Sequence, residues 1–403
     1  MLVPQDTRVC VVGLGYIGLP TAAVLASRGY TVHGVEVDAR AAEIINSGRA
    51  RIVEPDLDIL VRAAIETHKL EAHPGPAPSD IFMLCVPTPV TAGHAPDLSY
   101  VRSATASICP VLRPGNLIIL ESTSPPGTTE MIAEIVHANT ALAPGQVFFA
   151  HAPERVLPGQ ILREVVQNDR IVGGLDAKSS ELCAAFYRPF VAGQIHITSA
   201  RMAETVKLAE NAYRDVNIAF ANELSVLADE LGLDACDLIS LANRHPRVNI
   251  LNPGPGVGGH CIAVDPWFLV HAAPQLTPLI RQGRETNDAK PGWVVERIKR
   301  RAEGLEGARI ACLGLAYKPD IDDLRESPAV EVVHLLEAHG EYELRVVEPN
   351  LTEHRDFALM PLEQALEGAD IVVFLVAHRE FKSIPKKLLS EKVIFDTCGA
   401  LRG

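Results

Sequence analysis

The chain of 403 residues has no pair of cysteines at CxxC spacing, which argues against a structural zinc site, and we expect no metal. It also lacks an apolar run of the roughly 18 to 20 residues that span a bilayer. The N-terminal stretch "MLVPQDTRVCVVGLG" lacks the basic segment, long apolar run and cleavage site of a signal peptide. We therefore expect a protein of the cytoplasm with reduced thiols and no membrane partner. Its eight cysteines are scattered, at positions 10, 85, 109, 183, 236, 261, 312 and 398.

Positive charge is scarce. The chain has 37 Lys and Arg against 50 Asp and Glu, a formal net charge of −13, which argues against a nucleic-acid partner. A local cluster of lysine and arginine can still bind an anionic ligand. A hydrophobic content of 47% with 22% charged residues is typical of a globular protein, and the length suffices for two or three domains.

Short apolar runs alternate with helical patterns along the first 150 residues. The runs "VCVVGLG", "TVHGVEVD", "IFMLCVP", "LIILEST" and "VFFAHAPE" predict strands, and "GLPTAAVLASRG" and "ARAAEIINSG" predict helices. Strands buried on both faces and separated by helices are typical of a parallel sheet built from βαβ units. A second series of this kind follows residue 303, with the expected strands "ARIACLGL", "ELRVVEP", "IVVFLVAH" and "VIFDTCG".

Between the two series, apolar residues recur at helical spacing for about 30 residues from Arg201, until Gly232 can end the helix. A helix of this length either links domains or lines a subunit interface, so we expect at least a homodimer. The predicted fold is α/β, with two Rossmann-like doubly wound domains joined by a central helical domain. The expected domain bounds are 1–200, 201–303 and 304–403.

A glycine motif, GxGxxG, follows the first expected strand and opens a helix. In this context the first glycine makes a tight turn, the second admits a pyrophosphate, and the third lets helix and strand pack closely. A carboxylate after the next strand would bind the adenosine ribose hydroxyls and repel a 2′-phosphate, which favours NAD over NADP; we favour Glu36 over Asp38 for this role. The expected cofactor contacts in the motif are Gly13, Gly15, Tyr16, Ile17 and Gly18.

Three further polar residues stand at strand ends, where open α/β sheets bind ligands. Thr88 and Thr123 each follow a strand and are candidate cofactor or substrate contacts, although a turn-forming threonine needs no function. Glu154 follows what the pattern gives as the last strand of the first domain, a position suited to a general base. The alternative is an exposed turn acid.

Lys207 and Asn211 lie four residues apart on the long helix and therefore share one face of it. They interrupt its apolar stripe, so they could line a cleft and stabilise an oxyanion, or simply be solvated. Beyond the helix, Lys318, Arg325 and Ser327 follow a strand of the second α/β series and resemble phosphate-binding groups, unless Asp322 and Asp323 pair with them.

Cys261 follows a glycine-rich stretch, "GPGVGGHC". Cysteine usually packs as a small buried hydrophobe. Glycines 254, 256, 258 and 259, however, leave the backbone bare for a ligand. A helix that starts at the cysteine would activate its thiolate and place Asp265 about one turn later. A thiol nucleophile in an NAD enzyme can trap an aldehyde as a thiohemiacetal, so that a second hydride leaves and a thioester is hydrolysed.

Together these motifs resemble the nucleotide-sugar 6-dehydrogenases, the group that contains UDP-glucose dehydrogenase. The resemblance covers essentially the whole chain, through GxGxxG, "EST", "PPGTT", "PERVLPG", the Lys–Asn pair, "GGHC" and "YKPDIDDLRESP". The wording of "PERVLPG" and "GPGVGGHCIAVDPWF" is most similar to the branch that oxidises UDP-N-acetyl-D-mannosamine. The resemblance implies an NAD-dependent, four-electron oxidation of that sugar nucleotide to its uronate, for surface polysaccharides.

The resemblance also implies roles for individual residues. Cys261 would be the nucleophile, and Lys207 and Asn211 would stabilise the oxyanion. Asp265 would orient Lys207 or the thiol. Thr123 would hold a catalytic water, and Glu154 would be the base for thioester hydrolysis. Arg325 would reach the cofactor. Arg247 could serve the neighbouring subunit. The implied substrate contacts are Glu154, Arg155, Val156, Leu157, Lys207, Asn211, His245, Arg247, Gly258, Tyr317 and Lys318.

Two positions depart from the glucose enzymes of this group. Four residues after the position of Glu154 those enzymes carry a second acid, whereas this chain has Pro158. Near the C-terminus they carry an arginine at the position of Cys398, and whether Arg402 replaces that arginine is open. A glucose substrate is therefore disfavoured, while UDP-N-acetylglucosamine stays an alternative. A β-hydroxyacid dehydrogenase would need neither Cys261 nor the second α/β domain, and a non-catalytic nucleotide-sugar sensor would not need the Cys–Lys–Asn–Asp set.

Overall fold

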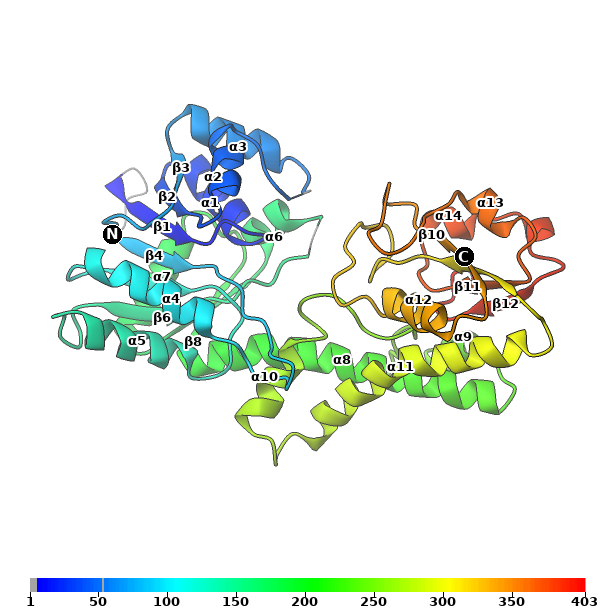
Figure 1. Cartoon of the computed structure of the whole chain (residues 1–403). Coiled ribbons are helices and arrows are strands. Elements are labelled where there is room, and N and C mark those ends of the chain that lie inside the picture. The colour runs from blue at the N-terminus through cyan, green and yellow to red at the C-terminus, as the bar shows by residue number, and fades with distance from the viewer. Residues whose placement is uncertain (1–5, 53, 158, 403) are drawn as a thin grey trace. The chain divides into compact units, whose positions relative to one another are not determined.

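The computed structural model describes residues 6–52, 54–157 and 159–402. These residues form two compact units (Figure 1). The first runs up to Ala209 and adds Trp267–Ala272, and the second comprises Glu210–Pro266 and the chain from Ala273 onward. No helix in the described part of the chain has both the length and the apolar character to cross a membrane.

The sheet of the first unit has the strand order β3-β2-β1-β4-β5-β6-β7-β8. Its strands are β1 (Arg8–Val12), β2 (Thr31–Val35), β3 (Leu70–His73), β4 (Ile81–Leu84), β5 (Leu117–Leu120), β6 (Phe148–His151), β7 (Arg170–Gly174) and β8 (Ile195–Ser199). Neighbouring strands are parallel except β6 and β7, which are antiparallel. The prediction that Glu154 follows the last strand of the first domain is wrong, because β7 and β8 come after it. These two were missed because β7 carries an arginine and β8 is an exposed edge strand, so neither is a buried apolar run.

Helices cover both faces of this sheet, because alternate residues of each strand point to opposite sides. Val9 and Val11 of β1 join the core beneath α1, α3, α6 and α7, while Cys10 and Val12 join the core beneath α4 and α5. The helices are α1 (Gly18–Ser27), α2 (Ala39–Asn46), α3 (Leu57–Glu66), α4 (Ser99–Ile108), α5 (Thr128–Asn139), α6 (Ile161–Gln167) and α7 (Ala177–Tyr187). The doubly wound arrangement expected from the sequence is confirmed for this unit.

The long helix is α8 (Ala200–Glu230), which passes from the first unit into the second between Ala209 and Glu210. Its predicted length is therefore confirmed, as is its linking position. The helices that follow are α9 (Ala235–Ala242), α10 (Asp265–Ala272) and α11 (Pro278–Ala302). In the second unit α8 and α11 share a buried ion pair, with Nη1 of Arg284 2.6 Å from Oδ1 of Asp215.

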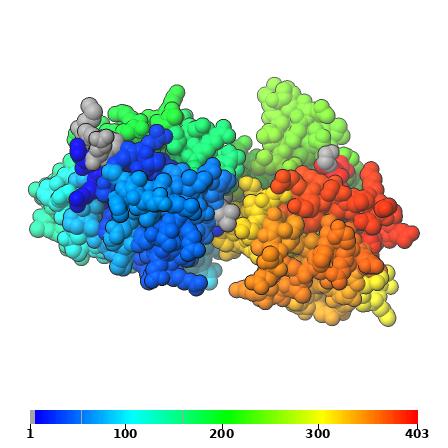
Figure 2. All heavy atoms as spheres, turned by 90° about the horizontal axis from the view of Figure 1, so that it is seen from above, coloured from blue at the N-terminus to red at the C-terminus, as the bar shows by residue number. Residues whose placement is uncertain are grey.

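The second unit contains a four-stranded parallel sheet of order β10-β9-β11-β12. Its elements are β9 (Arg309–Leu313), α12 (Pro328–His339), β10 (Glu343–Val347), α13 (Leu362–Leu366), β11 (Ile371–Phe374), α14 (Arg379–Lys382) and β12 (Val393–Asp396). Short 3-10 turns lie at Cys109–Val111 in the first unit and Lys386–Leu388 in the second. α11 and α12 pack on one face of the sheet and α13 and α14 on the other. In Figure 2 the segments from about residue 310 onward (orange to red) form one continuous body.

Candidate active site

The glycine motif after β1 has the geometry that a dinucleotide loop requires. Gly13 has φ of +95°, and a Cβ there would lie 2.6 Å from the carbonyl oxygen of Cys85. A Cβ at Gly18 would lie 1.8 Å from the carbonyl oxygen of Gly13, whereas a Cβ at Gly15 would meet nothing within 4 Å. The open side of the loop is therefore at Gly15, ahead of the N-terminus of α1, where a pyrophosphate fits.

The carboxylates after β2 have different surroundings. Asp38 caps α2, since its Oδ1 accepts the backbone N–H of Arg40 at 3.0 Å, and it forms an ion pair with Arg51 at 3.0 Å. Glu36 stands at the strand end and accepts the backbone N–H of Asp38 at 3.0 Å. Because Asp38 is committed to the helix cap, Glu36 stays the favoured candidate for the ribose. Tyr16, 45% exposed, and Ile17, the N-cap residue of α1, complete this loop.

The chain segments after β4 and β5 are tied to each other. The Thr88 hydroxyl is buried and donates to the carbonyl oxygen of Thr123 at 2.7 Å. The Ser122 hydroxyl donates to the carbonyl oxygen of Val86, also at 2.7 Å. Thr123 itself is half-buried, so the two predicted threonines lie together at the carboxyl edge of the sheet.

Glu154 is not an exposed turn acid, since its exposed fraction is only 7%. Its Oε1 accepts the backbone N–H of Arg155 at 2.7 Å, and its Oε2 lies 2.9 Å from Nη1 of Arg170. The neighbouring residues face differently: Arg155 donates to the carbonyl oxygen of Asp169, Val156 packs on the core, and Leu157 is 40% exposed. Pro158 lies outside the described residues.

Asn211 and Asp265 meet in the second unit, where both are buried. Nδ2 of Asn211 donates to Oδ2 of Asp265 at 2.5 Å, and the backbone N–H of Asp265 donates to the carbonyl oxygen of Cys261 at 2.8 Å. Asp265 is thus one turn after the cysteine, as predicted, but the helix α10 begins at Asp265 and not at Cys261. Cys261 is exposed and stands in the turn before the helix. Lys207, one turn before Asn211 on α8, is half-buried in the first unit.

The glycine-rich stretch before Cys261 packs against the loop after β9. A Cβ at Gly258 would lie 2.4 Å from the carbonyl oxygen of Glu326, and one at Gly259 would lie 2.8 Å from the Tyr317 ring. The backbone N–H of Gly259 donates to the carbonyl oxygen of Arg325 at 2.9 Å. The expectation that these glycines leave the backbone bare for a ligand is therefore wrong for this pair, because the chain itself fills the space.

The same loop carries the other residues predicted in this region. Nη2 of Arg325 pairs with Oδ2 of Asp323 at 2.6 Å, so one of the two aspartates does neutralise it in part. Ser327 is the N-cap of α12 and donates to the carbonyl oxygen of Leu315, which corrects its assignment as a phosphate ligand. Lys318 is half-buried.

His245 and Arg247 occupy an exposed turn after α9, where the backbone N–H of Arg247 donates to Nδ1 of His245. At the C-terminus, Arg402 forms ion pairs with Asp234 and Asp237 at the start of α9. Burial raises the pKa of the Cys398 thiol well above its ordinary value. Arg402 thus ties the C-terminal turn to α9.

Sequence reasoning missed buried polar residues that hold the predicted ones. Arg170 holds Glu154, and Glu121 lies beside Arg170. Glu204, on the first turns of α8, accepts the backbone N–H groups of Gly127 and Thr129 at the N-terminus of α5. A carboxylate inside an apolar strand end, "LEST", was the available signal for Glu121. In the described part of the chain, no group of three or more His, Cys, Asp or Glu side chains is placed to hold a metal.

Three family models match the chain in order. Residues 7–191 match the NAD binding domain of the UDP-glucose/GDP-mannose dehydrogenase family, residues 201–289 its central domain, and residues 311–403 its UDP binding domain. The first match confirms the prediction of NAD as cofactor, and the last confirms that of a UDP-sugar ligand.

Individual relatives agree with the family models. The NDP-N-acetyl-D-galactosaminuronic acid dehydrogenase of Ralstonia nicotianae is 52% identical over 97% of this chain and 95% of its own length. The UDP-N-acetyl-D-mannosamine dehydrogenase of Campylobacter jejuni is 50% identical over 97% and 99%. The structure of UDP-D-ManNAc dehydrogenase from Pyrococcus horikoshii superposes with a TM-score of 0.91, at 41% identity over 98% of this chain and 96% of that one. The chain belongs to the UDP-glucose/GDP-mannose dehydrogenase family.

Proposed function

We propose that the protein oxidises the C6 hydroxyl of UDP-N-acetyl-D-mannosamine to a carboxylate, with NAD as the hydride acceptor, to supply a uronic acid for surface polysaccharides. The observation that carries the proposal is the packing of the Cys261 turn against the loop from Tyr317 to Arg325. This contact joins a candidate nucleophile to the start of the region that matches the family's UDP binding domain. The resulting site suits a nucleotide whose sugar carries the reacting group.

The chemistry removes four electrons in two stages. Oxidation of the alcohol gives an aldehyde, and the Cys261 thiolate adds to its carbonyl carbon to form a thiohemiacetal. Loss of a second hydride gives a thioester, and water then cleaves the carbon–sulfur bond to release the acid and return the thiol. Each stage delivers one hydride to one molecule of NAD, so two are reduced per sugar. Because the mechanism needs a thiolate, we assign the protein to the reducing cytoplasm.

The polar residues predicted for the site suit the remaining roles. Lys207 and Asn211 would stabilise the oxyanion of the tetrahedral intermediates, and Asp265 would fix Asn211 through their 2.5 Å hydrogen bond. Thr123 would hold the attacking water and Glu154 would accept its proton. Tyr317 and Lys318 would contact the UDP-sugar, and Arg325 would reach the cofactor.

For the identity of the sugar, a second candidate has support of similar strength. Relatives at about the same identity are named for N-acetyl-D-galactosaminuronic acid and for N-acetyl-D-mannosamine. The epimer is set by the shape of the pocket. We favour the manno sugar because "PERVLPG" and "GPGVGGHCIAVDPWF" are similar to that branch of the family.

A panel of substrates tests the assignment. Purified protein is supplied with NAD and, in separate assays, the UDP-activated forms of N-acetylmannosamine, N-acetylgalactosamine, N-acetylglucosamine and glucose. We expect the highest kcat/KM with the manno sugar. Preference for the galacto or gluco sugar would overturn the epimer and leave the mechanism, whereas no NADH with any of them would overturn the function itself.

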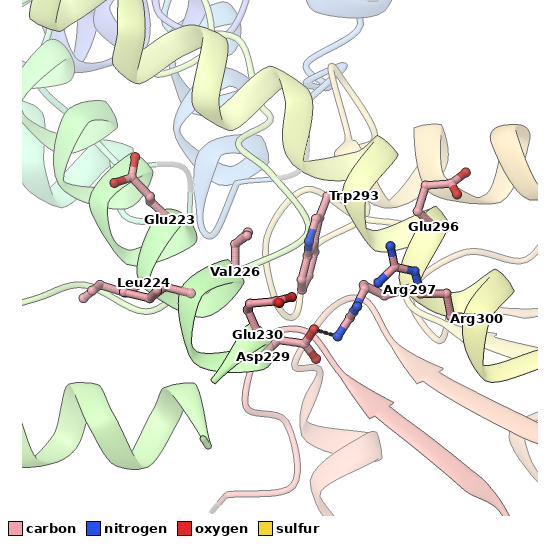
Figure 3. Close-up of a pocket in the computed structure, with 10 residues that line it drawn as sticks. Glu223, Leu224, Val226, Asp229, Glu230, Trp293, Glu296, Arg297 and Arg300 are labelled. Carbon is pink, nitrogen blue, oxygen red and sulfur yellow. Dashed lines mark ion pairs between the residues drawn. The ribbon is translucent and has the colours of Figure 1, made fainter. Parts of the chain in front are cut away.

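We also propose that the protein is at least a dimer, joined through the second half of α8. A groove of about 450 Å³ is lined by α8 and α11, and Figure 3 shows Trp293 of α11 beside an ion pair between Arg297 of α11 and Asp229 of α8. Phe220, Leu227 and Leu231 are half or more exposed along this part of the chain. The groove carries both signs of charge beside apolar side chains, so a second copy related by a two-fold axis would meet a complementary surface.

A further inference from the structure

We propose that Arg170 and Glu121 are positioning residues for Glu154, and that they set the pH dependence of the step in which the thioester is hydrolysed. The inference rests on the proposed role of Glu154 as the base for that step. It assigns a function to two buried charged residues that the proposed mechanism does not otherwise use.

The geometry is a chain of three charged groups beneath the carboxyl edge of the first sheet. Nη1 of Arg170 lies 2.9 Å from Oε2 of Glu154 and 3.5 Å from Oε1 of Glu121. The guanidinium carbon lies 4.7 Å from the centre of the Tyr187 ring, a cation–π contact. Glu154 is also held at its other oxygen by the backbone of Arg155, so it has one orientation.

Burial makes this arrangement energetically demanding. The exposed fractions of Glu121, Arg170 and Glu154 are 1%, 3% and 7%. Two carboxylates share one guanidinium, so the cluster carries a net negative charge when both are ionised, and a buried uncompensated charge is unfavourable. Binding of one proton to either carboxylate makes the cluster neutral. The buried cluster is therefore expected to bind a single proton.

The surroundings favour Glu121 as the holder of that proton. Burial and the neighbouring Glu154 raise the pKa of Glu121 to about 7, against the opposing effects of Arg170, Cys85 and Thr21. Sγ of Cys85 donates to Oε2 of Glu121 at 3.1 Å.

The other titratable groups that face the cluster stay neutral through this range. Burial raises the pKa of the Cys85 thiol and the Tyr187 hydroxyl well above their ordinary values, and it also raises that of Cys183. For Arg170 burial alone would lower the pKa, but Glu154, Tyr187 and Glu121 together raise it, so the guanidinium stays charged. Near neutral pH the variable charge is therefore that of Glu121.

The consequence for hydrolysis follows from the charges. Below about pH 7, neutral Glu121 leaves Arg170 to Glu154, and this ion pair orients the base. Above it, ionised Glu121 competes for Arg170 and places a second negative charge beside Glu154, which favours transfer of the water's proton to that carboxylate. The rate of thioester hydrolysis should therefore rise through about pH 7, where Glu121 loses its proton.

The test follows the Cys261 thioester by rapid quench and intact-mass analysis in single turnovers between pH 5 and 9. In Glu121→Gln, which keeps shape but cannot ionise, we expect the rise near neutral pH to disappear. In Arg170→Gln we expect the rise to move to higher pH by about one unit or more, because the guanidinium that opposes the raised pKa of Glu121 is gone. Both variants should form the first NADH at the wild-type rate, a readout that general damage to the fold would lower.

Two controls separate the possible failures. Arg113→Gln removes an exposed arginine that pairs with Asp80 in the same unit, and its profile should match that of the wild type. Glu154→Gln should accumulate the thioester; if it does not, the proposed base is wrong. If it does, and the Glu121→Gln profile still rises as in the wild type, only the positioning role is overturned. Should Arg170→Gln fail to fold, Glu121→Gln alone decides.

Discussion

At the scale of single residues, the presentation of Cys261 depends on two glycines that no other residue can replace. Gly259 has φ of +84°, and any side chain there would press on the Tyr317 ring. Gly258 leaves no room between its Cα and the carbonyl oxygen of Glu326. The turn that carries the thiol is therefore fixed to the loop after β9 by steric fit as much as by hydrogen bonds.

Substitution of Gly259 by alanine should destabilise the second unit by about 1 to 3 kcal/mol, the usual range for a non-glycine residue held at positive φ. We also expect kcat to fall, because the turn must move away from Tyr317. Gly254→Ala is the matched control, since the nearest atom to a Cβ there is 3.7 Å away. Thermal unfolding and steady-state kinetics of both variants check this, and equal effects would contradict the steric account.

At the scale of elements, the start of α8 is locked to the N-terminus of α5. Glu204 is fully buried, and its Oε1 accepts both the backbone N–H and the hydroxyl of Thr129 while its Oε2 accepts the backbone N–H of Gly127. The carboxylate occupies the positive end of the α5 dipole. Because Lys207 lies about one turn after Glu204 on α8, this contact also fixes the position of the lysine backbone.

The Glu204 contact makes stability depend on pH. Burial raises the pKa of Glu204 to about 7, although Thr129 and Gly127 oppose the change, so the folded protein holds this proton at pH values where the unfolded chain has lost it. The contribution of Glu204 is therefore most favourable below the ordinary pKa of a glutamate, and it declines as pH rises toward about 7.

Replacing Glu204 by Gln should flatten this decline. The difference in melting temperature between wild type and variant should change steadily from pH 5 to 7 and little above pH 8. A difference that does not vary over this range would show that Glu204 titrates as an ordinary exposed acid.

At the scale of the whole molecule, the sequence predicted both α/β sheets, the long helix and the order of the motifs, because buried parallel strands and long helices leave strong apolar periodicities. It missed β7, which carries an arginine and two glycines, and β8, which is an exposed edge strand. It singled out Cys261, Asn211 and Asp265 as candidates but not Arg170 or Glu204, because a lone charged residue in a strand or helix has the same local pattern whether it is solvated or buried. Only the fold brings Glu121 and Arg170, 49 residues apart, to one point.

Self-association is a prediction at the same scale. Leu227→Asp places a charge on the exposed apolar side of α8, so it should dissociate the oligomer to monomers, as measured by sedimentation velocity. Leu276→Asp is the control, because Leu276 is 83% exposed in the turn before α11 and lies off the proposed surface. Dissociation by both variants, or by neither, would contradict the proposed interface.

The central claim is that Cys261 is the nucleophile of a four-electron oxidation. It is tested most directly by counting the NADH formed per molecule of UDP-N-acetylmannosamine consumed, for the wild type and for Cys261→Ser. The account predicts two NADH per sugar for the wild type, with the acid as the only released product, and failure of the variant to complete the second oxidation. One NADH with release of the aldehyde, or a serine variant that still yields two at the wild-type rate, would contradict it.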